Sequence, residues 1–267
     1  NSLADIHQNI IATVSFIAAS GERFLANIAV AKQLKLRKNY EYCPDCKKKY
    51  SVKADTKVFS YCNLTFRQII ILIWCWQQKC SIGETIKIAG VSYPTVRRRL
   101  SPRFRASLKP SEAILEGACE VDGQLLWQEE VRAKQRLVIG AIDPKRQRIR
   151  LELFTAEIER MPERFVQQTI RAGSLVLTDG FSGYNELPAL GYEWLACNHS
   201  TGFFGSTNHI ENLLGVIKRA LRYIYRDLTF NLNDLGLILR EYENRYNNPD
   251  LFYSVDSYLK ARACYGF

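Results

Sequence analysis

The sequence lacks any apolar run long enough to cross a membrane. Ile69–Trp76 is continuously apolar, but a spanning helix needs about 20 such residues. Ile10–Ala19 resembles the apolar part of a signal peptide. However, the residues before it include Asp5 but no Lys or Arg, unlike the start of a signal peptide. Gly21-Glu22-Arg23 follows at the place where cleavage would occur. Both runs are predicted to be core helices, and no membrane association is expected.

Methionine is nearly absent, and acidic residues are fewer than basic ones. Met161 is the only methionine and the chain begins at Asn1, so we expect a fragment or a processed product. The 37 Lys and Arg exceed the 27 Asp and Glu, giving a formal net charge of +10. A clustered basic excess favours a nucleic acid as partner, whereas the alternative is that the charge only aids solubility.

The cysteines lack the spacing of a disulfide framework. All eight lie scattered in mostly apolar contexts, so buried, reduced thiols are expected. Reduced thiols predict an intracellular protein. With a nucleic acid as its partner, it is expected with DNA in the nucleus of a eukaryote or in the cytoplasm or nucleoid of a bacterium.

The hydrophobic pattern changes at the linker Ser107–Glu112. Before it, three helices are predicted, at Phe66–Lys79, Ser81–Ala89 and Ser92–Leu100, the last ending before Pro102. After it, the predicted strands are 118–127, 136–142, 148–154, 174–178 and 192–197, and the predicted helices are 158–172, 208–225 and 232–247. This order predicts an α/β fold with an RNase H-like mixed sheet flanked by helices, preceded by a small α-helical helix-turn-helix domain.

Three acidic residues stand at positions suited to a metal site. Asp122 lies in the first predicted strand of the sheet. Asp179 ends a buried strand and precedes Gly180, so its carboxylate is expected at the carboxyl edge, where open α/β sheets place ligands. Glu211 lies on a long amphipathic helix. Each alone is readily an ordinary surface or turn acid, but together they predict one metal site.

Phosphodiester chemistry explains the need for such a set. In-line attack uses two divalent cations about 3.5–4 Å apart, and Mg²⁺ takes carboxylate, water and phosphate oxygens. Lys218 lies about 10 Å beyond Glu211 on the same helix face, where a cation can hold a DNA phosphate. Arg219 and Arg222, which follow on the same helix, are also predicted to contact DNA. The alternative is that Lys218 is a solvated helix residue followed by these two arginines.

These residues carry a resemblance to DDE transposases. The segment Leu177–Tyr184 is similar to their second-Asp motif, and Glu120-Val121-Asp122-Gly123 is similar to the first. Further similar segments are Asn198–Ser200, Thr207–Asn212, Ile217–Arg219, Glu241-Tyr242 and Asn244–Asn247. Over roughly residues 40–250 the chain resembles the bacterial insertion-sequence group related to eukaryotic Merlin elements.

The resemblance implies Mg²⁺-dependent (or Mn²⁺-dependent) cleavage at element ends and strand transfer into target DNA. It implies that Asp122, Asp179 and Glu211 hold the metal. Glu211 is favoured as the third residue because its spacing to Lys218 matches the E-x6-K pattern. Some relatives carry Asn as the third residue, so Asn208 and Asn212 are open alternatives. The implied partners are double-stranded DNA, as terminal repeats and target, and further copies of the same chain.

Two further positions, His199 and Gly123, bear on the comparison with the family. His199 matches a family position, but a structural hydrogen-bonding role is the favoured interpretation. Relatives usually carry an acidic residue directly after the first Asp, and Gly123 stands there instead. This departure indicates either divergence or weakened activity.

Cys43 and Cys46 form a C-x2-C pair that resembles the second half of the family's zinc ribbon. A structural Zn²⁺ site needs four ligands, yet residues 1–42 contain no Cys and only His7. Cys62 and Cys75 could supply the two missing ligands, but nothing in their spacing requires it. A lapsed ribbon or free thiols are therefore favoured over a zinc site.

The helices before the linker predict a helix-turn-helix module. A short helix and a Gly90 turn precede a polar helix, which would enter the major groove of DNA. Its predicted DNA contacts are Tyr93, Thr95, Arg97, Arg98 and Arg99. The alternative is a solvated basic helix packed on the catalytic domain.

Four segments are thus predicted along the chain. They are a helical amino-terminal segment (1–38), a degenerate zinc-ribbon-like segment with the helix-turn-helix domain (39–108), an RNase H-like catalytic domain (112–250) and a carboxyl-terminal tail (251–267). The predicted function is that of a transposase. The alternatives are another RNase H-like nuclease and a catalytically inactive DNA-binding remnant.

Overall fold

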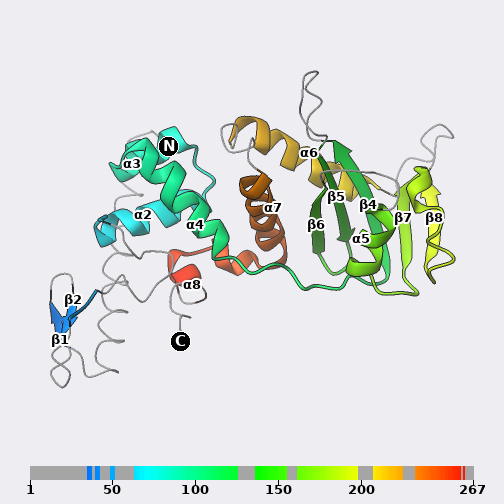
Figure 1. The fold of residues 1–267 in the computed structure, drawn as a ribbon, viewed down its shortest axis with the longest axis horizontal. Coiled ribbons are helices and arrows are strands. Elements are labelled where there is room, and N and C mark those ends of the chain that lie inside the picture. The colour runs from blue at the N-terminus through cyan, green and yellow to red at the C-terminus, as the bar shows by residue number, and fades with distance from the viewer. Residues whose placement is uncertain are drawn as a thin grey trace. The chain divides into compact units, whose positions relative to one another are not determined.

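The computed structural model describes residues 35–37, 40–42, 49–51, 63–125, 136–154, 161–197, 207–224, 232–259 and 261. The chain divides into two compact units (Figure 1). One unit comprises Asn1–Leu108 with Asp250–Phe267, and the other comprises Lys109–Pro249. Among the described residues, no helix has the length and apolar character that a membrane span requires.

A small antiparallel sheet forms the first described part of the first unit. Its strands are β1 (Lys35–Arg37), β2 (Tyr40–Tyr42) and β3 (Lys49–Ser51), in the order β1-β2-β3. The expectation of a helical segment up to residue 38 is therefore wrong at its end. Arg37 pairs with Tyr40 across a two-residue connection, so pairing with β2 overrides the helical spacing of the preceding sequence.

Three helical stretches follow, and their starts and stops are built into the sequence. Helix α2 (Phe66–Gln77) begins at a capping box made by Thr65 and Gln68, and α3 (Ile82–Ala89) begins at one made by Ser81 and Glu84. Helix α3 ends at Gly90, whose φ of 62° places it in the left-handed region. The two α-helices and the turn between them thus form where the sequence predicts them.

The third helical stretch is longer than the sequence predicts. A π-helical segment, η1 (Thr95–Leu100), runs directly into α4 (Ser101–Ala106). The expected end before Pro102 is wrong, because this proline occupies the first turn of α4. Residues 93–106 form one continuous helical stretch, and the proline is accommodated just after the junction between its π-helical and α-helical parts.

The core of the first unit also includes residues close to the carboxyl terminus. Segments η4 (Pro249–Phe252) and α8 (Val255–Tyr258) bring aromatic rings against Trp76. The ring centroids of Phe252 and Tyr258 lie 5.3 and 5.2 Å from that of Trp76. Residues 251–259, which lie in the predicted tail, therefore contribute to a packed aromatic cluster.

A five-stranded mixed sheet forms the centre of the second unit (Figure 1). Its strands are β4 (Ala118–Leu125), β5 (Leu137–Asp143), β6 (Arg148–Phe154), β7 (Leu175–Asp179) and β8 (Glu193–Cys197). They lie in the order β6-β5-β4-β7-β8. Strand β5 is antiparallel to β4 and β6, whereas β4, β7 and β8 run parallel. The predicted α/β fold with a mixed sheet and flanking helices is confirmed, and this strand order is consistent with the predicted RNase H-like sheet.

Helices cover both faces of this sheet, because successive side chains along a strand point to opposite faces and apolar side chains lie on both. Along β5, Ile139 and Ala141 pack with α5 (Met161–Thr169), whereas Val138 and Ile142 pack with residues of α6 and α7. Helix α6 spans Asn208–Tyr223 and α7 spans Leu232–Asn247. The face beneath α6 is the face that carries the candidate site.

Candidate active site

Asp122 and Asp179 lie on neighbouring parallel strands at the same level. The ladder between β4 and β7 pairs Val121 with Thr178, and the two acids are the next residue of each strand. Neighbouring strands lie about 4.8 Å apart, and residues in register point to the same face. Because Val121 packs in the core beneath α5, the two acids point to the opposite face, which α6 covers.

A tight turn holds Asp179 at the end of its strand. The Phe181 N–H donates to Asp179 Oδ1 over 3.3 Å, and the 3-10 helix η2 (Ser182–Tyr184) returns the chain to the sheet. On the neighbouring residue, the Thr178 hydroxyl accepts from the Trp194 indole N–H over 2.9 Å. Asp179 is therefore anchored through its own carboxylate and through the residue before it.

The charges of Asp122 and Asp179 both affect the pKa of Tyr184. Its side chain is buried in the core beneath α5, and this burial is the largest cause that raises the pKa of its hydroxyl. The negative charges of Asp179 and then Asp122 raise that pKa further. Tyr184 thus lies within electrostatic reach of both carboxylates, in agreement with their neighbouring positions on β4 and β7.

Glu211 lies in the first turn of α6. Its side chain is exposed, and its Oε1 accepts a hydrogen bond from the Thr207 hydroxyl over 2.6 Å. Thr207 is the buried N-cap residue of the helix. The Glu211 carboxylate is therefore drawn toward the helix N-terminus, where the helix dipole favours negative charge.

A glycine lets α6 approach the sheet directly beside Asp122. Gly140 on β5 is the cross-strand partner of Asp122. A Cβ atom on Gly140 would lie 2.8 Å from Ile210 Cδ1 and 3.4 Å from Leu214 Cδ2. Ile210 thus packs over the residue opposite Asp122, and Glu211 is the next residue along the helix.

Glu120 ties the same helix turn to β4. Its Oε2 accepts the backbone N–H groups of His209 and Ile210 over 2.9 and 3.0 Å. Its Oε1 lies 2.6 Å from His209 Nδ1. The Glu120 side chain is 5% exposed, and such a buried carboxylate is tolerated because charge-assisted hydrogen bonds and the helix dipole compensate its desolvation.

Two acidic side chains, Asp122 and Asp179, lie where they could hold a divalent cation, and Glu211 is not grouped with them. Among the residues that the structure describes, no three His, Cys, Asp or Glu side chains are grouped so that they could hold a metal ion. Asp122 and Asp179 supply adjacent carboxylate oxygens, which is the donor type Mg²⁺ prefers. Mg²⁺ is often held by one or two carboxylates, with water and phosphate oxygens completing its shell.

The exposed side of α6 is basic beyond its first turn. Lys218, Arg219 and Arg222 are exposed there, and so are Asn208 and Asn212 near its start. Within the described part of the chain, none of the three cations forms an ion pair. This face therefore presents positive charge that can meet phosphate groups.

In the first unit, the predicted DNA contacts gather at the start of the third helical stretch. Arg97 donates from Nη1 to the Tyr93 hydroxyl over 2.8 Å, and its guanidinium carbon lies 5.7 Å from the centre of the Tyr93 ring. Thr95 shares a hydroxyl hydrogen bond of 2.9 Å with Ser92. Arg98 and Arg99 lie in η1, but their side chains fall outside the described ones.

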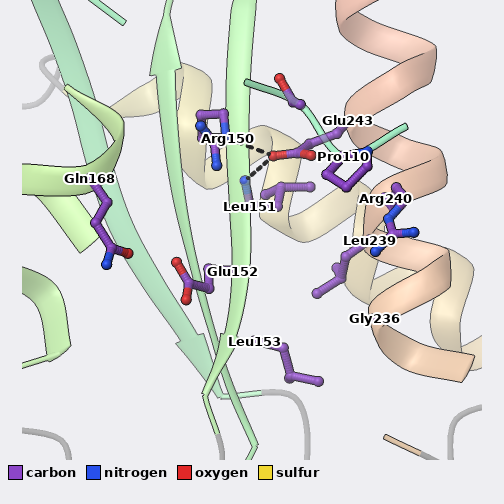
Figure 2. A pocket seen from close by; sticks show the side chains of 11 residues that line it. Pro110, Arg150, Leu151, Glu152, Leu153, Gln168, Gly236, Leu239, Arg240 and Glu243 are labelled. Carbon is purple, nitrogen blue, oxygen red and sulfur yellow. Dashed lines mark hydrogen bonds and ion pairs between the residues drawn. The ribbon is translucent and has the colours of Figure 1, made fainter. Parts of the chain in front are cut away.

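A separate cavity lies at the β6 edge of the sheet. Its volume is about 440 Å³, and Figure 2 shows Glu243 of α7 reaching Arg150 and the backbone of Leu151 on β6. Burial raises the pKa of Glu243, although the hydrogen bond from the Leu151 N–H and the Arg150 charge oppose this effect. None of the three predicted metal ligands lines the cavity.

Glu120 is the residue of this region whose role the sequence did not disclose. The motif around Asp122 includes it, but nothing local predicts its bonds to residues 89 and 90 positions later. The available signal was its spacing, because residues two apart on a strand share a face. His199, Cys43 and Cys46 lie outside the described residues, so their predicted roles stay predictions.

Comparison with known proteins gives a match to one domain family and one relative of similar sequence. Residues 114–232 match the sequence profile of the ISXO2-like transposase domain. An "Uncharacterized transposase-like protein" of Haemophilus influenzae is 27% identical over 86 residues, which are 32% of this chain and 70% of that protein.

Among solved structures, the chain is similar to one in a simian T-cell lymphotropic virus intasome bound to PP2A regulatory subunit B56 gamma. The identity is 11%, and the match covers 63% of this chain and 66% of that one. Its TM-score of 0.33 is too low to support an inference. Over residues 114–232, which include both aspartates and Glu211, the chain is therefore similar to transposases of the insertion-sequence type.

Proposed function

We propose that the chain is a transposase that cleaves DNA at the ends of a mobile element and joins them to target DNA. The observation that carries this proposal is the pair Asp122 and Asp179, at the same level on parallel strands within the region that matches a transposase domain. The relation to Merlin elements and the double-stranded DNA partners belong to the same proposal.

In this mechanism Asp122 and Asp179 hold Mg²⁺ or Mn²⁺, and Glu211 completes the site from α6. Such cations activate the nucleophile and stabilise the leaving oxygen in phosphodiester chemistry. Lys218 and Arg219 position a DNA phosphate along the same helix face. Among the described residues Glu211 is not grouped with the two aspartates, so in this proposal its carboxylate would leave the Thr207 hydroxyl to join them.

Element ends are recognised, in this proposal, by the helices of the first unit. Tyr93 orients Arg97 through a hydrogen bond and a cation–π contact, so the guanidinium is held rather than freely mobile. A homo-oligomer would bring two ends together. Zinc binding by Cys43 and Cys46 is not required for this role.

Replacing Arg97, Arg98 and Arg99 together by Ala should lower the affinity for DNA and make that affinity less dependent on salt concentration. Each lost phosphate contact lowers the slope of log K against log salt by about 1, so the slope should fall by up to about 3. Fluorescence anisotropy across a salt series measures this. Arg67→Ala, an exposed change on α2, is the control, and an unchanged slope in the triple variant would place DNA contact elsewhere.

A second candidate is an inactive DNA-binding remnant. It is favoured by Gly123, which stands where relatives carry an acidic residue and whose N–H binds Asp122 Oδ1 over 2.7 Å. Another RNase H-like nuclease is the third candidate. It differs from a transposase in its products, because it would hydrolyse DNA without joining it.

One assay separates these candidates. The purified chain is incubated with duplex DNA taken from the sequences flanking its gene, with and without Mg²⁺. A transposase should give Mg²⁺-dependent nicks and products joined to a target plasmid. Nicks without joined products indicate a simple nuclease, and binding without nicks indicates the inactive remnant.

A further inference from the structure

Three contacts converge on one buried carboxylate in the second unit. Glu120 accepts the N–H groups of His209 and Ile210 and contacts the His209 ring. Both of its oxygens are thereby in contact with α6. Its three contacts all belong to the first turn of α6, which also carries Glu211.

Glu120 and Asp122 are two residues apart on β4. They share a face of the sheet, with a rise of about 3.3 Å per residue along the strand. Ile210, which Glu120 holds by its backbone, packs over Gly140, the cross-strand partner of Asp122. The position of the first turn of α6 relative to Asp122 is therefore set from two sides, by hydrogen bonds and by close packing.

We propose that Glu120 is a positioning residue, which holds the first turn of α6 so that Glu211 can reach the metal held by Asp122 and Asp179. This inference rests on the proposed two-aspartate site and adds a residue that acts without touching metal or DNA. Residues that orient metal ligands in this way commonly change metal affinity or activity by about 10–100-fold when replaced.

The test is Mn²⁺ binding by the full chain, followed by the electron paramagnetic resonance signal of free Mn²⁺. Glu120→Gln keeps the size of the side chain but replaces one acceptor oxygen with an NH₂ group, so the single remaining oxygen cannot serve both the backbone N–H pair of α6 and the His209 ring. We expect Mn²⁺ affinity to fall by about 10–100-fold. The measurement is made well below the melting temperature, so lower stability by itself leaves the affinity of the folded protein unchanged.

Two further variants keep the test decisive. His209→Ala removes only the ring contact of a side chain that is 61% exposed, so it should fold and weaken Mn²⁺ binding in the same direction but less. Glu193→Gln removes an equal charge from an exposed site on β8 and should bind as the unmutated chain does. Unchanged affinity in both Glu120→Gln and His209→Ala overturns the inference.

The failure of this inference differs from the failure of the proposed function. If Asp179→Asn loses Mn²⁺ binding while both Glu120→Gln and His209→Ala keep it, only the positioning role is wrong. If the unmutated chain does not bind Mn²⁺, the two-aspartate site is wrong, and the positioning role falls with it.

Discussion

Asp179→Asn should abolish Mg²⁺-dependent nicking while leaving DNA binding intact. The carboxylate would be one of two adjacent metal ligands on parallel strands, and metal ions contribute several kcal/mol of transition-state stabilisation. Since 1.4 kcal/mol corresponds to a factor of ten in rate, the loss should be about a thousand-fold or more. A nicking assay under single-turnover conditions measures it.

The substitution is suited to this purpose because it preserves the local fold. The Oδ1 of an asparagine can still accept the Phe181 N–H that Asp179 accepts over 3.3 Å, so the turn after β7 should survive. Asp250→Asn, at an exposed position in the other unit, is the control and should nick normally. Full nicking by Asp179→Asn, with an unchanged melting temperature, would refute the metal-binding role of this residue.

Asn247→Ala should strongly destabilise the second unit. The Asn247 side chain accepts the Ile149 N–H over 2.9 Å and donates to the Ile149 carbonyl over 2.9 Å. It also donates to the Ser111 hydroxyl over 3.1 Å. Ile149 is fully buried, and each buried group that loses its partner costs about 1–3 kcal/mol.

The free energy of unfolding should therefore fall by about 3 kcal/mol, which lowers the melting temperature by roughly 6–12 °C in a domain of this size. Differential scanning calorimetry measures the shift. Asn248→Ala is the matched control, because the Asn248 side chain is exposed and makes a single 3.5 Å hydrogen bond to Asn244. Equal melting temperatures for the two variants would contradict this account.

The Asn247 contact also explains how the sheet ends. Strand β6 is at the edge of the sheet, and an open edge invites pairing with another chain. Asn247 occupies both backbone groups of Ile149, and Glu243 accepts the Leu151 N–H over 2.8 Å. Helix α7 thus takes the place of a sixth strand by means of side chains, and the Arg-Tyr-Asn ending of this helix has a structural role.

Local sequence pattern was enough to predict most elements and the positions of Asp122 and Asp179 on their strands. The short strand-forming runs at 118–125, 137–143 and 148–154 and the helical spacing of 208–223 depend only on neighbouring residues. The placement of Asp179 at a strand end followed from its motif in the same way. The prediction failed at Pro102 and at residues 35–37, where a continuous helical stretch and a strand partner override the local signal.

Tertiary structure alone decided how these elements are joined at the site. Glu120 reaches 90 residues ahead to hold α6, Asn247 reaches 98 residues back to close β6, and Gly140 makes room for Ile210. Residues 251–259 pack around Trp76 rather than forming a separate tail. Hydrophobic periodicity specifies which face of an element is buried, but it carries no information about the distant residue against which that face packs.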